Sequence, residues 1–420
     1  MAETLITAIQ MKLPVHAWRA AATLLIIGAL GGPASAQPQL LEEPDISKAR
    51  VRIGPLALSP AIDLVSLGID SNVFNDPADQ AKRDFTFTLT PRTEFWMRAG
   101  RTWLTGDLRE DIVWYQKFSS ERSGNNYASL AWMVPLNRLR FKVSGAYANG
   151  RARPGFEIDA RASHRELTYQ GWAELRTFAR TYVGVRGTRQ QVEFGRQAFF
   201  LGSSLRNELD RIVTETSLTV RQQLTPLTSI IFDGGREEDR FTFSQLRDSN
   251  STTAGVQVTF DPSALIKGSA RIGYRDLEPL VPGVAPYRGP TAAVDLTYVL
   301  LGTTRFGVQV GRDVRYSYDV GSPYYLQTGI RASIAQQLFG PIDIVATGEA
   351  QRLAYRDRAG IAAAIANRTD AYRLYGGGMG YHLGEDLRVG VNVEKAWRTS
   401  NVDSRQYEGF RVGTTVTYGF

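Results

Sequence analysis

The strongest constraint on the fold of this chain is an alternation of apolar and polar residues, with a period of two, along most of its length. Between Phe85 and Arg98 the odd positions carry mainly Phe, Leu and Met, whereas the even positions carry mainly Thr, Arg and Glu. The same alternation returns later, for example from Leu139 to Tyr147 and from Leu387 to Glu394. Such a pattern is typical of β-strands whose two faces meet different surroundings. The sequence therefore predicts an all-β fold.

We count 18 alternating segments, which begin near residues 61, 83, 102, 126, 139, 164, 181, 208, 227, 249, 266, 289, 304, 323, 342, 370, 387 and 407. Every second connector is a tight turn, such as Ala99–Arg101, and the others are mostly longer and polar. The longer ones include Ser119–Asn125, Gly150–Ser163, Arg196–Asn207, Asp276–Arg288 and Asp357–Thr369. This arrangement is typical of a bacterial outer-membrane barrel. We expect a transmembrane antiparallel up-and-down β-barrel of about 18 strands (alternatively 16), with short periplasmic turns and long extracellular loops.

A soluble β-propeller or β-helix is the alternative to this barrel. Those folds repeat a motif at a fixed period, roughly 40 to 50 residues per propeller blade, and the chain shows no such motif. Two features do not fit a simple barrel strand. Pro91 lies inside the second strand, where its missing N–H should mark a bulge or an edge, and Trp96 and Trp103 have inward parity. The outward parity expected of an aromatic girdle is found at Trp114, Trp132 and Trp397.

The first 36 residues have the features of a secretory signal peptide. Lys12 and Arg19 precede the apolar run Ala20–Leu30, and Ala34-Ser35-Ala36 forms an A-x-A cleavage site. The apolar run is too short for a membrane anchor, which needs roughly 20 residues. Either Met1 or Met11 could be the true start. We therefore expect a signal peptide (residues 1–36), a short periplasmic segment (37–60) and a barrel (61–420).

The composition argues against catalysis and bound cofactors. The chain has no Cys and 3 His, so thiolate metal sites, Cys nucleophiles and lipid anchors are excluded and a His-built metal site is not expected. It also lacks a phosphate-binding G-x-x-x-x-G-K-[ST] motif. A barrel hydrolase built on Ser163, His164 and Glu166 is a minor alternative, because adjacent Ser and His point to opposite faces of a strand. We expect no enzyme, no cofactor, no metal and, for an exported chain, no nucleic-acid partner.

Both ends of the barrel sequence carry a resemblance. The chain ends Val416-Thr417-Tyr418-Gly419-Phe420, which resembles the C-terminal signal that outer-membrane barrels present to the barrel assembly machinery, with Tyr418 and Phe420 as its residues. The segment Gly68–Phe74, followed by Thr90-Pro91-Arg92, resembles the opening of a broad family of putative β-barrel porins associated with exopolysaccharide loci. That resemblance implies a polysaccharide cargo and a periplasmic polysaccharide-export protein as a partner.

The basic residues of the chain are almost all arginine, 42 of 49, and strand parity places many of them on the inner face. The candidate cargo-contact residues are Arg98, Asp107, Arg109, Asp111, Arg140, Lys142, Trp172, Arg176, Arg211, Arg221, Arg271, Arg275, Arg305, Arg315, Arg331, Arg388 and Arg411. The same parity holds for Glu215, Lys267, Asp313 and Arg398. A basic lumen favours acidic or phosphate-bearing solutes, and sugars could stack on the inward Trp96, Trp103 and Trp172. Each single charge could equally belong to an ion pair that only stiffens the wall.

These observations support a pore that exports an exopolysaccharide across the outer membrane. The alternative is a diffusion porin for small anionic solutes. Outer-membrane lipid and lipopolysaccharide would surround the barrel, and we expect Arg151, Arg153, Arg161 and Arg165 on the outer loops to meet lipopolysaccharide phosphates. Long loops such as Gly150–Ser163 and Asp357–Thr369 could fold inward as gates, which the sequence does not decide.

Overall fold

The computed structural model describes residues 43–44, 46, 49–360 and 366–419. The predicted signal peptide, the choice between Met1 and Met11, and Phe420 of the predicted assembly signal lie outside the described residues. None of the helices in the described part of the chain is long and apolar enough to cross a membrane.

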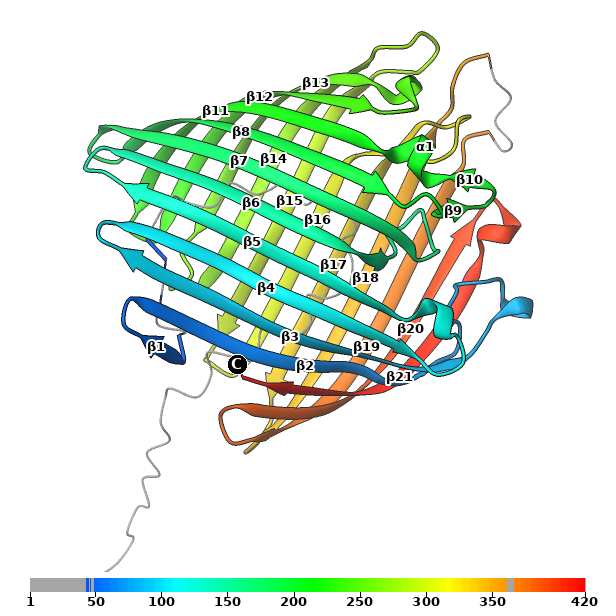
Figure 1. The fold of residues 1–420 in the computed structure, drawn as a ribbon, viewed down its shortest axis with the longest axis horizontal. Helices are drawn as coiled ribbons and strands as arrows, with labels where there is room; N and C mark the ends of the chain where they lie inside the picture. The colour runs from blue at the N-terminus through cyan, green and yellow to red at the C-terminus, as the bar shows by residue number, and fades with distance from the viewer. Residues whose placement is uncertain (1–42, 45, 47–48, 361–365, 420) are drawn as a thin grey trace, which may run out of the picture.

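The described residues form a closed antiparallel barrel of 18 strands (Figure 1). Each barrel strand pairs with the next barrel strand along the chain, and β2 pairs with β21 to close the ring. The barrel strands are β2 (Leu56–Asp70), β3 (Asp84–Ala99), β4 (Thr102–Tyr115), β5 (Ser123–Pro135), β6 (Leu139–Ala152), β7 (Ala162–Phe178), β8 (Thr181–Phe194), β11 (Arg211–Thr225), β12 (Thr228–Phe241), β13 (Ser249–Phe260), β14 (Ile266–Pro279), β15 (Tyr287–Leu300), β16 (Thr304–Tyr316), β17 (Tyr324–Gln337), β18 (Ile342–Arg356), β19 (Thr369–Leu383), β20 (Leu387–Ser400) and β21 (Tyr407–Tyr418).

The remaining elements are short and are not strands of the barrel. They are β1 (Val51–Ile53), the hairpin β9 (Phe199–Phe200) and β10 (Ser203–Ser204), helix α1 (Leu205–Leu209), and the single-turn 3-10 helices Ala78–Gln80, Ser119–Glu121, Gln245–Arg247 and Asp403–Arg405. The predicted fold class and strand number are confirmed, with 18 rather than 16 strands. The largest difference in a strand start is at the first strand, predicted near residue 61 and observed to begin at Leu56.

The connectors divide the barrel into two unlike ends. At one end, here called the short-turn end, the strands are joined by connectors such as Gly100-Arg101, where Gly100 has a φ of 62° that favours glycine. The chain enters and leaves the barrel at this end (Figure 1). At the other end, the long-loop end, the connectors include 153–161, 195–210 and 357–368.

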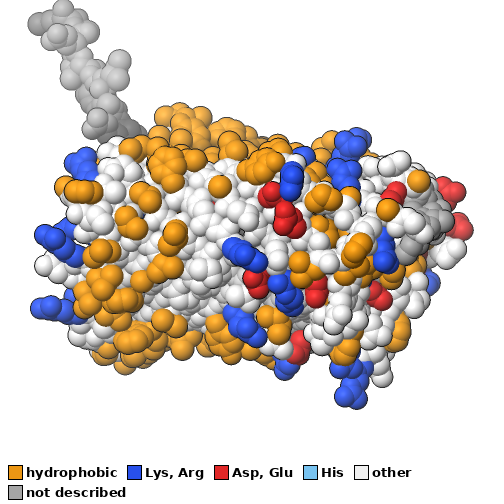
Figure 2. Space-filling model, turned by 90° about the horizontal axis from the view of Figure 1, so that it is seen from above, with side chains coloured by type: hydrophobic (Ala, Val, Ile, Leu, Met, Phe, Trp, Pro, Cys, Tyr) orange, Lys and Arg blue, Asp and Glu red, His pale blue; other side chains and the backbone are white. Residues whose placement is uncertain are grey.

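The two faces of the wall differ as the alternation predicts. Apolar side chains such as Trp132, Leu218 and Ile272 are exposed on the outer face. Figure 2 shows hydrophobic side chains spread over the outside of the barrel. Trp96 and Trp103 lie on the inner face and pack with Ala57 and Met133 at the short-turn end, where Ile46 and Ala49 of the N-terminal segment also contact them.

Pro91 does not produce the predicted bulge. Strand β3 is an interior strand, and its register with β4 is the same on both sides of Pro91, since Leu89 pairs with Ile112 and Arg92 with Arg109. The missing N–H removes hydrogen bonds without shifting the strands, and Thr90 Oγ1 donates to Asp111 Oδ1 at 2.8 Å across the gap. The register of β2 with both of its neighbours shifts instead around Ser66, which has a φ of 55°. Further shifts lie at the short-turn ends of β7 and β11.

Candidate functional site: the lumen

Arginine–carboxylate ion pairs between strands line the inner face of the wall. Arg221 on β11 donates through Nε and Nη2 to the two carboxylate oxygens of Glu174 on β7, at 2.8 and 2.7 Å, and both side chains are fully buried. Arg271 on β14 donates in the same way to Asp233 on β12, at 3.0 and 2.6 Å. Bidentate pairs of this kind are the stronger type of charge-assisted hydrogen bond.

Two glycines make room for arginines that reach across a whole strand. Arg388 on β20 crosses β19 at Gly380 to bind Asp343 on β18. A Cβ at Gly380 would lie 2.3 Å from Arg388 Nη2, and a Cβ at Gly255 on β13 would lie 2.6 Å from Nη2 of Arg271. Glycine at these positions allows the guanidinium to lie flat on the intervening strand.

Ion pairs within the wall, the alternative given for each single charge, account for many of the predicted inner-face arginines. Seven of the candidate cargo-contact arginines pair with carboxylates of the wall or of their own strand: Arg109 with Asp111, Arg221 with Glu174, Arg271 with Asp233, Arg275 with Glu237 and Asp313, Arg331 with Glu349, Arg388 with Asp343, and Arg411 with Asp70. Most of these carboxylates were missed by the sequence analysis, although the same parity that places the arginines inside also places Glu174, Asp233, Glu237, Asp343 and Glu349 there.

The short-turn end of the lumen has a different charge pattern. Besides Arg221 and Arg388, six inner-face basic residues lie within five residues of the turns at this end, and we call this set the basic mouth: Arg98, Arg140, Lys142, Arg176, Lys267 and Arg305. The inner-face carboxylates at the same depth, among the described strands, are Glu174 and Asp343. These two already bind Arg221 and Arg388.

The inward tryptophans do not present the predicted row of stacking platforms. Trp96, Trp103 and Trp172 are 8, 6 and 5 % exposed, so their rings are part of the packed wall and offer little surface to a sugar. Of the other candidates, Arg211 on β11 lies near the rings of Phe241 and Tyr316, with its guanidinium carbon 5.8 and 5.9 Å from their centroids. Arg315 and Asp107 lie on the inner faces of β16 and β4.

A loop from one side of the barrel crosses the lumen at the long-loop end. This segment, Arg153–Arg161 between β6 and β7, is called the lumen loop below. Arg398 on β20 donates through Nη1 to the carbonyl oxygen of Phe156 at 2.7 Å and contacts Asp159 Oδ2 at 3.1 Å. Arg405, from the loop after β20, binds Asp159 Oδ2 at 2.8 Å. Guanidinium groups from the far wall therefore hold the lumen loop in place.

Glu157 is the buried carboxyl group of the lumen loop. Ser317, in the loop after β16, donates its hydroxyl to Glu157 Oε1 at 2.6 Å. Burial raises the pKa of Glu157 from 4.5 to about 7, although the Ser317 hydrogen bond and the nearby Arg368, Arg405 and Arg398 oppose the shift. Below about pH 7 this carboxyl group is therefore mostly protonated while the lumen loop is in place.

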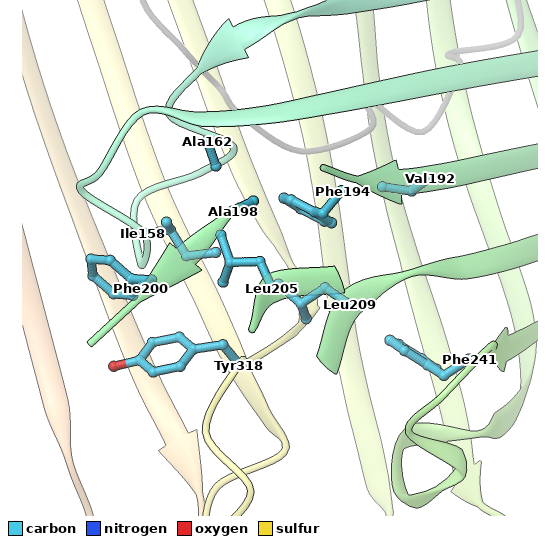
Figure 3. Close-up of a cluster of buried hydrophobic side chains, with 10 residues drawn as sticks. All are labelled: Ile158, Ala162, Val192, Phe194, Ala198, Phe200, Leu205, Leu209, Phe241 and Tyr318. Carbon is cyan, nitrogen blue, oxygen red and sulfur yellow. The ribbon is translucent and has the colours of Figure 1, made fainter. Parts of the chain in front are cut away.

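Beside Glu157, Ile158 inserts into an apolar cluster formed by several loops and strand ends (Figure 3). The cluster consists of Ile158, Ala162, Val192, Phe194, Ala198, Phe200, Leu205, Leu209, Phe241 and Tyr318. The rings of Phe200 and Tyr318 meet edge to face, with centroids 5.0 Å apart. The long-loop end is thus filled on this side by an apolar layer that joins the lumen loop, the loop carrying α1 and the loop after β16.

The lumen loop separates two spaces in the barrel. A cavity of about 340 Å³ on its short-turn side is lined by Phe156, Tyr372 and the glycine-rich stretch 376–378. A second cavity of about 800 Å³, on the side of the long loops, is lined by residues such as Arg161. Arg153 and Asp159 line both cavities, which places the lumen loop between them.

Three of the four arginines expected to meet lipopolysaccharide contact other loop residues instead. Arg151 and Arg161 both bind Glu121, and Arg153 donates to the carbonyl oxygens of Asp159 and Val73, so these three hold loops together. Of the four, Arg165 has the outward position, where it pairs with Glu193.

The proposed hydrolase residues do not form a catalytic arrangement. Strand β7 places Ser163 and His164 on opposite faces, His164 Nδ1 lies 3.1 Å from the carbonyl oxygen of Ala162, and Glu166 accepts from Gln190 at 3.2 Å. Near the chain end, Tyr418 is exposed on the outer face, and its role in an assembly signal stays a prediction.

Comparison with known proteins adds one family and a set of barrel structures. A family model described as putative beta-barrel porin 2 matches residues 43–420. No curated protein matches the sequence closely enough to count as a relative. The FrpB iron transporter from Neisseria meningitidis (F3-3 variant) shares 8 % identity with a TM-score of 0.40, over 82 % of this chain, which spans 62 % of that transporter.

Two solved structures of Pseudomonas aeruginosa are covered almost completely. OccK2 (OpdF), solved in complex with glucuronate, shares 8 % identity with a TM-score of 0.46, over 86 % of this chain and 97 % of OccK2. OccK3 (OpdO) shares 11 % identity with a TM-score of 0.43, over 86 % of this chain and 95 % of OccK3.

Proposed function

The chain belongs to the family described as putative beta-barrel porin 2, and on that premise we propose that this outer-membrane barrel is a closed pore that opens to export an exopolysaccharide. The short-turn end faces the periplasm and the long-loop end faces the exterior, as in other bacterial barrels of this design. A periplasmic polysaccharide-export protein would deliver the polymer to the short-turn end, with energy from the inner membrane.

The lumen loop is the observation that carries this proposal. A diffusion porin needs a standing aqueous passage, whereas here Arg398 and Arg405 fasten the lumen loop to the far wall and Ile158 anchors it in an apolar cluster. Moving the loop aside breaks several charge-assisted hydrogen bonds and exposes apolar surface, so spontaneous opening is rare. A pore that is closed at rest suits a cargo delivered by a partner better than free diffusion.

A diffusion porin for small anionic solutes is the second candidate, because the basic mouth would attract small anions as well as polymers. Single-channel recording of the purified barrel separates the two. Export predicts low conductance at rest and a large increase when residues 153–161 are replaced by a short Gly-Ser turn. A stable conductance of the native protein equal to that of the shortened variant would favour the porin.

A genetic test addresses the cargo directly. We expect deletion of the chain to abolish secretion of the polymer while uptake of small antibiotics is unchanged, and we expect the intact chain to restore secretion. Unchanged polymer secretion combined with reduced uptake of small anions would contradict export and support the second candidate.

A further inference from the structure

The outer face of β17, β18 and β19 carries an unbalanced positive charge near the long-loop end. The outward positions of these three strands, all of whose residues the structure describes, hold Arg352, Arg356 and Arg373 and no carboxylate. Arg352 and Arg373 are both exposed. Arg352 pairs in register with Ala371, two residues before Arg373, so the two arginines are diagonal neighbours on one face, with Cβ atoms roughly 7 to 8 Å apart. One anionic group could therefore contact both.

Outward arginines elsewhere on the barrel have carboxylates beside them. On β12, Arg236 and Arg240 share Glu238, at 3.3 Å from each. The carboxylate in the loop after β18, Asp357, accepts a hydrogen bond from the hydroxyl of Ser322 at 2.9 Å. The charge of the outer face of β17–β19 is thus not offset by outward carboxylates of its own strands.

A groove of about 820 Å³ adjoins the two arginines on the outside of the barrel. Tyr375, Lys395 and Trp397 line it from β19 and β20, and the loop after β20 adds polar groups such as Gln406. The ring centroids of Tyr375 and Trp397 are 5.4 Å apart. Trp397 pairs in register with Arg373, so an aromatic, polar groove and a basic pair lie side by side.

This groove lies at the boundary between the apolar outer surface and the long loops. On its short-turn side, Ile334, Met379 and Val393 are 37, 58 and 40 % exposed on the outer face, as expected of positions that face acyl chains. Tyr and Trp are enriched at the level of lipid headgroups, which is the level that Tyr375 and Trp397 mark here. A lipid at this place would have its acyl chains on the apolar surface and its headgroup at the groove.

We propose that this surface is a binding site for one molecule of lipopolysaccharide, the phosphorylated glycolipid of the outer leaflet. A phosphate group binds Arg352 and Arg373, and the adjoining sugar occupies the groove beside Trp397. Guanidinium groups match phosphate oxygens through forked donors, and basic clusters at a membrane surface recognise anionic headgroups. The proposal uses the orientation of the barrel, with the long-loop end outside, and is independent of the cargo of the pore.

The binding test uses the full chain in detergent, with native mass spectrometry to count the lipid molecules that the folded barrel retains. Diphosphorylated lipid A is the probe. Phosphatidylglycerol has a phosphate but no sugar, and diglucosyl diacylglycerol has sugars but no phosphate. We expect lipid A to bind more tightly than either comparison lipid, because each of them makes one of the two contacts. Equal binding of lipid A and either comparison lipid would overturn the proposal.

Charge removal locates the phosphate contact. The variant Arg352→Gln/Arg373→Gln should bind lipid A about twenty-fivefold more weakly, at roughly fivefold per arginine. The matched control Arg236→Gln/Arg240→Gln removes two outward arginines that Glu238 already binds, and it should change the affinity little. Circular dichroism checks that both variants form the barrel. Equal losses in the two variants would show that general charge, rather than this surface, attracts the lipid.

The substitution Trp397→Ala tests the groove. We expect this variant to lose the preference for lipid A over phosphatidylglycerol while its binding of phosphatidylglycerol stays the same, since the phosphate contact remains. A variant that kept the full preference would contradict the placement of the sugar.

A cysteine locates the site independently, because the chain has none of its own. Ala371 lies on the outer face between Arg352 and Thr399, its register partners on the two neighbouring strands. Lipid A should slow thiol labelling of Ala371→Cys but not of Thr252→Cys, an exposed outward position that pairs with Arg236. Absence of protection at Ala371→Cys, or equal protection at both positions, would contradict the proposed site.

Discussion

Replacement of Glu157 by Gln tests whether the lumen loop is the gate. Glu157 is fully buried, and its pKa is raised to about 7 because burial disfavours its charge. When the lumen loop leaves its site, the carboxyl group enters water and its pKa returns to about 4.5. Closing of the loop is therefore linked to uptake of one proton. Gln keeps the acceptor for Ser317 and removes the titration.

The sign and size of the effect follow from these two pKa values. Below about pH 4.5 the carboxyl group is protonated in both states, so closing is most favourable there. As pH rises from about 4.5 to about 7, the open state gains about 1.4 kcal/mol per pH unit, or about 3 kcal/mol in total, and the gain levels off above pH 7. That energy is on the order of a hundredfold in the ratio of open to closed barrels.

Recording in planar bilayers from pH 4.5 to 8 measures this ratio. We expect the open fraction of the native barrel to rise with pH and level off near pH 7, and we expect Glu157→Gln to stay mostly closed throughout. Glu408→Gln, which removes an exposed outer-face carboxylate paired with Lys395, should behave like the native barrel. The reasoning would be refuted if Glu157→Gln kept the full pH dependence or if the open fraction fell as pH rose.

Three further substitutions test the wall and the latch. Arg398→Ala leaves Asp159 and Asp370 without their shared partner, so we expect a higher open fraction and a loss of about 3 to 5 kcal/mol in urea unfolding from lipid vesicles; an unchanged open fraction would contradict the latch. Gly380→Ala should displace Arg388 and lower the free energy of unfolding by about 1 to 3 kcal/mol. Gly171→Ala, whose Cβ meets no atom within 4 Å, should lower it little. Equal losses in the two variants would contradict the crossing of β19 by Arg388. Leu218→Arg on the outer face should cost about 2 to 4 kcal/mol in the same assay, and a negligible loss would mean that this position lies outside the lipid.

The strands and turns could be predicted because both follow from local chemistry. A wall between lipid and water imposes a period of two on every strand, and each hairpin turn interrupts it, so the starts of strands such as β4 and β6 were predicted to the residue. Pro91 shows the limit of this reasoning. A missing N–H predicts an irregularity but not its form, and neighbouring pairs on both sides were strong enough to keep the register.

The lumen loop could not be predicted in the same way. Its contacts join residues that are far apart in the chain, such as Asp159 and Arg398, and no local pattern distinguishes a loop that folds inward from one that extends outward. The ion pairs of the wall could be predicted from the sequence only in part. Parity places Glu174 and Arg221 on the same face, but their pairing depends on the strand order around the barrel.

The two ends of the lumen differ in what the wall arginines can reach. At the long-loop end, Arg368 and Arg398 share one strand carboxylate, Asp370. The remaining donor capacity of Arg398, together with Arg405, is taken up by Asp159 and the backbone carbonyls of the lumen loop. These contacts hold the lumen loop inward.

At the short-turn end the connectors are too short to fold back into the lumen. Between β3 and β4 the connector has only Gly100 and Arg101, which cannot bring an acceptor to the inner wall. Acceptors for groups such as Arg305 must then come from outside the described chain, from water or from a solute.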